Sequence, residues 1–307
     1  MTSQTARKTE RVGLSHRLAE RGIDRTLWLL LPGILFALVL FVYPFVYGMG
    51  LTVQPSARIV EQWGNGIFAN YIAFFNDPFI FDSVWITLKL AIPVALFNVI
   101  VSVPIAFKLR GKFRGKRTLM TLLVLPITLG TVLTAQGMLI FLGRQGWLNK
   151  ALLEMGLIDQ PIQFVMNYWG VAISLVISGF PFAFLLISSY LSGIDPSLEA
   201  AARTMGAGWG KRLTRITLPL LAPGLATTFI LTFVLAFSVF PSARLVGDAM
   251  GSTRVMSLMA FRAFGEQNDY SMASTIALMM GLVEFIVVLL VLALRGTLYR
   301  GSTGGKG

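Results

Sequence analysis

The stretch Glu199–Pro219, EAAARTMGAGWGKRLTRITLP, is a polar, basic connection between two blocks of apolar sequence of membrane-spanning length. Three alanines follow Glu199, and Gly206 comes next after a short Arg-Thr-Met segment. Nine residues separate Gly206 from Ile216, and one residue later comes the pair Leu218–Pro219. The connection therefore carries a defined internal spacing, and its apolar flanks place it in a membrane protein.

The composition extends this conclusion to the whole chain. Of 307 residues, 55% are hydrophobic and only 13% are charged, whereas an ordinary soluble domain is about 25% charged. The mean hydropathy is +0.73. We therefore expect one membrane domain over residues 27–295, preceded by a basic arm over 1–26 and followed by a short tail over 296–307.

Six stretches are long and apolar enough to cross a hydrocarbon core of roughly 30 Å as helices, which takes about 20 residues each. Several contain proline, which membrane helices tolerate because neighbouring helices satisfy the freed backbone groups. The arm is too long and polar to be a cleaved signal peptide, so we expect the first span to be retained. The expected spans are Leu27–Val53, Ser83–Phe107, Thr118–Phe141, Asn167–Leu191, Ala222–Pro241 and Ser274–Leu294.

Lysine and arginine are distributed unevenly between the two sides of these spans. Six lie in the arm, six in the loop over 108–117, four in the loop over 203–215 and three at the C-terminal end, whereas the alternate loops hold far fewer. Because cytoplasmic loops of membrane proteins are enriched in Lys and Arg, both termini and the Glu199–Pro219 loop are predicted to be cytoplasmic. The formal charge of +12 is thus explained by topology, and we expect no nucleic-acid partner.

The side chains that catalysis and metal binding need are scarce. There is no cysteine, and the one histidine, His16, lies in the charged arm. The basic segment Gly111–Arg117 contains two glycines at a spacing too short for a phosphate-binding loop, and Arg117 stands where that motif needs Ser or Thr. We predict no catalytic residue, no cofactor and no metal site.

The Glu199–Pro219 loop resembles the EAA loop of permease subunits of binding-protein-dependent ABC importers, on the alanines, the glycine and the nine-residue gap to Ile-x-Leu-Pro. The family's glutamate stands six residues before the glycine, a position that Ala200 occupies here, with Glu199 one residue further upstream. The resemblance implies two short helices joined at the glycine and docked on an ATPase subunit. The implied coupling residues are Glu199, Ala200, Ala201, Ala202, Gly206, Ala207, Ile216, Leu218 and Pro219.

The residues themselves suit such a loop. Asp195 and Pro196 are favourable at a helix start, the alanines are strong helix formers, and Gly206 permits a sharp reversal. Pro219 and Pro223 are expected to end the loop where the next span begins.

The same resemblance implies a type I ABC importer permease in the bacterial inner membrane, with six spans and both termini cytoplasmic. It implies as partners a second homologous permease, two ATPase subunits, an extracytoplasmic solute-binding protein and the lipid bilayer. The segment Leu142–Leu152 and the region over 241–274 are similar to external segments of the spermidine/putrescine branch. A polyamine or related cationic solute is therefore the implied cargo, although related branches carry ferric iron, sulfate, thiamine or opines.

Polar residues inside the spans are the candidates for cargo contact, because ionisable groups are costly in hydrocarbon. Glu284 is the one carboxylate well inside a span. It either attracts a cationic cargo or makes a structural hydrogen bond or ion pair, for which Lys89 is the nearest cation at comparable depth. Lys89 lies near an outer end, where its stem can reach the interface. Asn98 and Gln136 add uncharged polarity, which commonly holds membrane helices together.

Two other classes of protein compete with the importer permease. An ion-coupled secondary transporter predicts inverted repeats, interrupted spans and several buried carboxylates. A membrane-embedded enzyme predicts clustered catalytic side chains within the spans. The sequence has one such carboxylate and no evident inverted repeat, and its lone histidine and isolated Glu284 argue against an enzyme. The secondary transporter stays the leading alternative.

Overall fold

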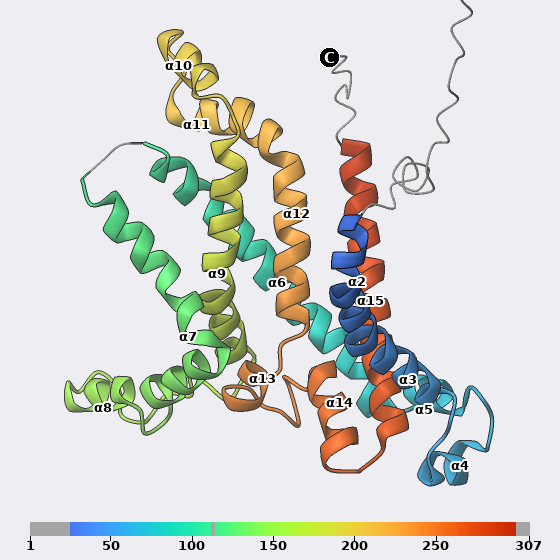
Figure 1. Cartoon of the computed structure of the whole chain (residues 1–307). Helices are drawn as coiled ribbons and strands as arrows, with labels where there is room; N and C mark the ends of the chain where they lie inside the picture. The colour runs from blue at the N-terminus through green and yellow to red at the C-terminus, as the bar shows by residue number, and fades with distance from the viewer. Residues whose placement is uncertain (1–24, 112–113, 299–307) are drawn as a thin grey trace, which may run out of the picture. The chain divides into compact units, whose positions relative to one another are not determined.

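The computed structural model describes residues 25–111 and 114–298, and the regular elements in that part of the chain are all helical (Figure 1). Most of the expected arm over 1–26, with His16, and of the expected tail over 296–307 lies outside the described residues. The chain divides into two compact units, residues 1–51 and residues 52–307.

The first unit supplies the first span. It contains α2 (Arg25–Ala37), the π-helical turn η1 (Leu38–Val42) and most of α3 (Tyr43–Thr52), in an unbroken helical course. The π turn ends two residues before Pro44. Proline cannot donate a backbone hydrogen bond and clashes with the carbonyl four residues before it, and a wider turn relieves that clash. The predicted first span is confirmed.

The second unit contains the other five predicted spans. Each is observed as a long helix, and the bounds differ from the expected ones chiefly at the ends. The helices are α6 (Pro78–Leu109), α7 (Lys116–Leu142), α9 (Tyr168–Ser192), α12 (Leu218–Phe237) and α15 (Tyr270–Leu298).

The fifth span begins earlier than the sequence suggested. A continuous helical course runs through α11 (Trp209–Arg212), the π turn η2 (Leu213–Thr217) and α12. The expectation that Pro219 and Pro223 end the loop is therefore wrong. Pro219 lies in the first turn of α12, directly after the π turn, where its missing N–H and its bulk are accommodated in the same way as at Pro44.

Short helices cap the two ends of the second unit. At one end, α10 (Pro196–Thr204) and α11 form the connection between α9 and α12 (Figure 1). The opposite end carries the remaining short helices (Figure 1). These are α4 (Ala57–Trp63), α5 (Ala69–Asn76), α8 (Trp147–Glu154), α13 (Pro241–Leu245) and α14 (Met256–Gly265).

The core of the second unit forms where α6 packs against α9 and α12, with α7 against α9 and α15 against α12 and α14. Small residues permit the close approach of these helices. A Cβ atom at Gly224 would lie within 3 Å of the Tyr190 ring, and one at Gly179 would lie 2.7 Å from Nδ2 of Asn98. The α9 contacts with α6 and α12 therefore depend on glycine.

One span is interrupted near its middle. Gly130 in α7 has φ 70° and ψ 165°, which is not helical, and its surroundings are exposed in this chain. Irregular backbone at membrane depth is tolerated only against protein or beside water. The described part of this chain leaves that segment of α7 uncovered.

Candidate coupling surface

The reversal between α10 and α11 is a glycine-dependent helix cap. Gly206 has φ 80°, in the left-handed region that favours glycine. Its N–H donates to the Arg203 carbonyl at 3.0 Å, and the Ala207 N–H donates to the Ala202 carbonyl at 2.9 Å. These two bonds form a Schellman motif, which ends a helix and turns the chain sharply. The expected pair of short helices joined at Gly206 is confirmed.

The start of α10 is also set by local chemistry. Asp195 is the N-cap, and its side chain accepts from the Ser197 N–H at 2.8 Å, while Pro196 occupies the first turn. Hydrogen bonding by Ser197, from its side chain and then its backbone, lowers the pKa of Asp195 below its ordinary value. The cap is therefore ionised at neutral pH, as a helix N-terminus favours.

An ion pair fixes α10 to the end of α6. Arg110 Nη1 lies 2.5 Å from Glu199 Oε1, and the two side chains are only 18% and 15% exposed. Arg110 Nη2 also donates to the backbone carbonyl of Ile194, just before α10. One guanidinium thus joins the ends of two basic loops, which the sequence had already placed on the same side of the membrane.

The other arm of the reversal is fixed by apolar contact. Trp209, the first residue of α11, meets Phe107 of α6 edge to face, with ring centroids 5.7 Å apart. Leu213 is buried and packs in the same cluster as Phe107 and Leu221. Aromatic pairs of this kind contribute on the order of 1 kcal/mol beyond the burial of their area. Both arms of the loop are therefore held at the C-terminal end of α6, by its last turn and by its C-cap residue Arg110.

The tip of the loop presents an exposed surface that combines apolar and basic side chains. Met205, beside the reversal, is 83% exposed, and Leu198 and Trp209 are each 46% exposed. Ala200 and Ala201 are exposed on α10. Exposed basic side chains surround them, at Arg203, Lys211 and Arg215. Clustered exposed apolar side chains rimmed by charge are typical of a protein-binding surface.

The structure separates the predicted coupling residues into two groups. Ala200, Ala201 and Gly206 lie at the exposed tip, with Ala202 and Ala207 partly buried in its cap. Ile216, Leu218 and Pro219 lie instead in η2 and the first turn of α12, where Leu218 packs on the buried cluster. Glu199 belongs to neither group, because its carboxylate is bound to Arg110.

Sequence reasoning missed four contributors to this surface. Arg110 was counted only among the basic residues that set topology, although it joins two loops. In the sequence Phe107 ends an expected span, and Met205 and Trp209 stand between the motif positions. Met205 and Trp209, with Gly206 and Gly208 between them, were the available signal, since large apolar residues in a polar loop need a contact.

The substrate-path candidates do not form one cluster. Glu284 Oε1 accepts a hydrogen bond from the Ser238 hydroxyl at 2.8 Å, which joins α15 to the end of α12. In the part of the chain that the structure describes, Glu284 does not form an ion pair with Lys89. The Lys89 side chain is exposed, and its backbone carbonyl accepts from the Tyr168 hydroxyl at 2.8 Å.

Asn98 and Gln136 lie in different surroundings. Asn98 is buried between α6 and α9, and its Oδ1 has no hydrogen-bond partner among the described residues, as is also true of the Ser102 hydroxyl one turn later. Gln136 is exposed on α7. Gln136 is therefore accessible to water or to another chain, whereas Asn98 is enclosed within this one.

The chain is similar in sequence to permease proteins of two transport systems. The chain is 29% identical over 217 residues to the probable sulfate transport system permease protein cysT of Prototheca wickerhamii, covering 70% of this chain and 83% of that protein. It is 31% identical over 220 residues to the spermidine/putrescine transport system permease protein PotB of Salmonella typhimurium strain LT2, covering 69% and 74%.

A solved structure shares the fold. A chain of a bacterial alginate ABC transporter, crystallised in complex with an alginate pentasaccharide-bound periplasmic protein, superposes with a TM-score of 0.75 at 20% identity, over 91% of this chain and 95% of that one. The helical bundle is that of a type I ABC importer permease. The family model for the inner membrane component of binding-protein-dependent transport systems matches residues 25–301, and the chain belongs to that family.

Proposed function

We propose that this chain is a permease subunit of an ATP-driven importer and forms half of the translocation path for a small solute delivered by an extracytoplasmic binding protein. The observation that carries the proposal is the α10–α11 reversal, which presents an exposed apolar and basic tip while both of its arms are held to α6. Because both arms of the tip are fixed to α6, a movement of a partner bound at the tip would also move the membrane spans.

The energy comes from ATP through a separate pair of ATPase subunits, which grip this tip and the corresponding loop of the second permease. ATP binds the two states of the ATPase pair with different affinities, and that difference is what shifts the permease between inward-open and outward-open states. This chain itself couples and conducts, because its family is a transporter component and not an enzyme.

The other half of the path comes from a second homologous permease. Most of the third and sixth spans is not covered by this chain. In the most apolar stretch of each span, the buried share is 6% in the third span and 11% in the sixth, against 56% in α6. The interruption at Gly130 lies in that exposed third span. A facing permease and an enclosed aqueous path provide the protein or water contact that such backbone needs. The assembly is proposed to lie in a bacterial inner membrane.

Affinity purification of the tagged chain from native membranes tests this proposal. We expect an ATPase chain and a second six-span chain to co-purify, and uptake by the reconstituted complex to require ATP and the binding protein. An ion-coupled secondary transporter instead gives uptake by this chain alone, driven by an ion gradient and indifferent to ATP. That second result would replace the importer by the alternative.

The proposed cargo is a cationic solute of the polyamine class, supported by the Glu284 carboxylate within the sixth span and by similarity to PotB. Sulfate is the second candidate, supported by similarity to cysT.

Glu284→Gln distinguishes these two cargoes. For a cation we expect the uptake KM to rise about fivefold, which corresponds to on the order of 1 kcal/mol of lost attraction. The matched control Ser238→Ala removes the hydrogen bond to Glu284 but keeps the charge, so its KM should stay close to that of the wild type. A lower KM for sulfate in Glu284→Gln favours the anion, and an unchanged KM for both solutes removes Glu284 from the path.

A further inference from the structure

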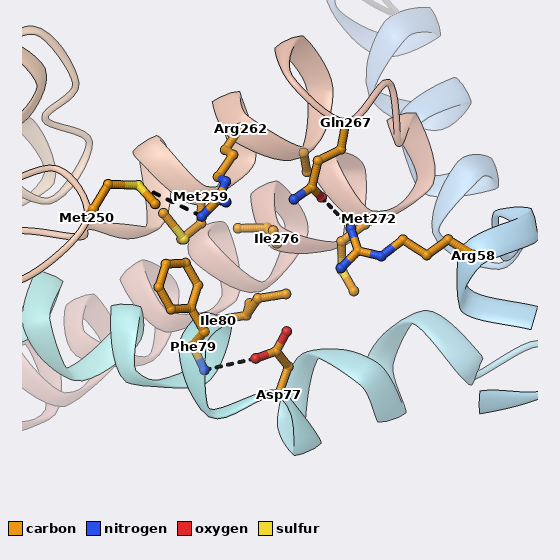
Figure 2. Close-up of a pocket in the computed structure, with 11 residues that line it drawn as sticks. Arg58, Asp77, Phe79, Ile80, Met250, Met259, Arg262, Gln267, Met272 and Ile276 are labelled. Carbon is orange, nitrogen blue, oxygen red and sulfur yellow. Dashed lines mark hydrogen bonds between the residues drawn. The ribbon is translucent and has the colours of Figure 1, made fainter. Parts of the chain in front are cut away.

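A cavity of about 280 Å³ lies at the end of the second unit opposite the α10–α11 tip, between α4, the start of α6 and the α14–α15 turn (Figure 2). Two guanidinium groups border it, those of Arg58 and Arg262, together with the carboxylate of Asp77. Its floor is apolar, and Met259, Met272 and Ile276 in that floor are buried. The topology predicted from the basic loops places this cavity outside the cytoplasm.

The Arg58 charge is not neutralised within the described residues. Arg58 Nη1 donates to Oε1 of Gln267 at 2.8 Å, which is a neutral acceptor (Figure 2). None of the ion pairs in the described part of the chain includes Arg58. The side chain is exposed, so a carboxylate from outside the chain can reach it.

The carboxylate of Asp77 does not supply that partner. Its Oδ1 accepts from the Phe79 N–H at 2.9 Å, and Asp77 is the N-cap of the 32-residue helix α6. The positive end of the helix dipole, equivalent to about half an elementary charge, therefore compensates part of its charge. The cavity keeps an excess of positive charge at Arg58.

Arg262 adds to that excess. Its Nε lies 3.4 Å from Oε2 of Glu266, and Oε1 of the same carboxylate lies 3.7 Å from Arg244. One carboxylate is thus shared between two guanidinium groups. Arg262 also lies over the Phe79 ring, 5.3 Å from its centroid, which helps to hold it at the cavity wall.

The shape and chemistry fit an acidic side chain with an apolar stem. The volume is slightly below the roughly 300–1,000 Å³ of pockets that enclose whole drug-sized ligands, which favours one inserted side chain over a complete solute. We propose that the cavity receives a glutamate or aspartate side chain of the solute-binding protein, with its carboxylate on Arg58 and its stem against the methionine floor. This inference rests on the proposed importer function.

The same region is connected to the sixth span. The Ser56 hydroxyl, two residues before Arg58, donates to Oδ2 of Asp269 at 2.7 Å. Asp269 Oδ1 in turn accepts from the Met272 N–H at the start of α15, at 2.9 Å. A side chain docked on Arg58 therefore acts beside the first turn of the helix that carries Glu284.

The test measures the affinity of the purified binding protein for the complete transporter in nanodiscs. Arg58→Glu should weaken binding about tenfold or more, because it sets two carboxylates against each other. Gln267→Glu is the sharper variant. It places a carboxylate next to Arg58 within the chain, which preserves the local contact and the thermal stability, yet it should weaken binding in the same direction.

The matched control is Arg144→Glu, at an exposed arginine after α7 that makes the same change of charge away from the cavity. It should leave the affinity unchanged. Binding by Gln267→Glu that equals wild-type binding overturns the inference, as does an equal loss in Arg144→Glu, which assigns the effect to general surface charge. A wild-type transporter that recognises no binding protein instead overturns the proposed function, and this inference with it.

Discussion

Gly206→Asp is expected to abolish ATP-driven uptake while the permease still reaches the membrane. A Cβ built at Gly206 has no atom within 4 Å beyond its chain neighbours. Aspartate is strained at this left-handed position by about 1–2 kcal/mol, less than most residues because it is among those that enter the region. The α10–α11 reversal should therefore be weakened but still form. The loss of uptake arises in the proposed assembly, where the new carboxylate is buried without a partner at the contact with the ATPase. Such a charge costs about 3–5 kcal/mol, which lowers the affinity for the ATPase by a factor of more than about a hundred.

The measurements are uptake into proteoliposomes and retention of the ATPase during purification. Gly208→Asp is the matched control, since it adds the same charge two residues away at the N-cap of α11, where aspartate is favoured. We expect this control to fold and to retain far more uptake than Gly206→Asp. Wild-type uptake by Gly206→Asp would exclude the reversal from coupling.

The parts of the structure that the sequence predicted correctly depend on local signals. Span positions follow from runs of apolar residues, and the loop helices follow from the cap at Asp195, the alanines and Gly206. Each of these signals acts within a few residues of its effect. Pro219 shows the limit of such reasoning, because a π turn absorbed the constraint that normally ends a helix.

Contacts between distant segments could not be predicted in this way. Arg110 and Glu199 are 89 residues apart, and nothing in either loop distinguishes a paired arginine from the five other basic residues around it. The sequence allows a structural hydrogen bond or ion pair at Glu284 and indicates Lys89 as the nearest cation, but it does not indicate the Ser238 hydroxyl, which is the observed partner. Which helices are neighbours decides such contacts, and that is a property of packing rather than of any local pattern.

The shifted glutamate has a structural explanation in the Arg110 contact. The Glu199 carboxylate is largely buried against the end of α6. Ala200, which stands at the family's usual position for glutamate, is exposed at the tip. Glu199 thus acts within the chain, and the exposed alanines leave room for close approach by a partner. We accordingly propose Arg110 as a positioning residue, which sets where the tip lies without forming part of its exposed surface.

A charge reversal at this pair should have the second large effect. Arg110→Glu sets two carboxylates against each other in a mostly buried site and also removes the donor to the Ile194 carbonyl. We expect uptake to fall at least about tenfold and the thermal stability to drop, since one uncompensated charge of a buried pair costs about 3–5 kcal/mol. Glu199→Arg should be similarly impaired, with two guanidinium groups in contact.

The double variant Arg110→Glu/Glu199→Arg restores an ion pair of opposite polarity. It should recover part of the uptake and stability, with a coupling energy of about 1–3 kcal/mol in the double-mutant cycle. Recovery stays incomplete because a glutamate at position 110 cannot donate to the Ile194 carbonyl. The control Arg117→Glu makes the same change of charge at an exposed position in α7 and should alter uptake little. If the two single losses simply add in the double variant, the pair does not hold the tip, and the α6 end positions it through Phe107 and Trp209 alone.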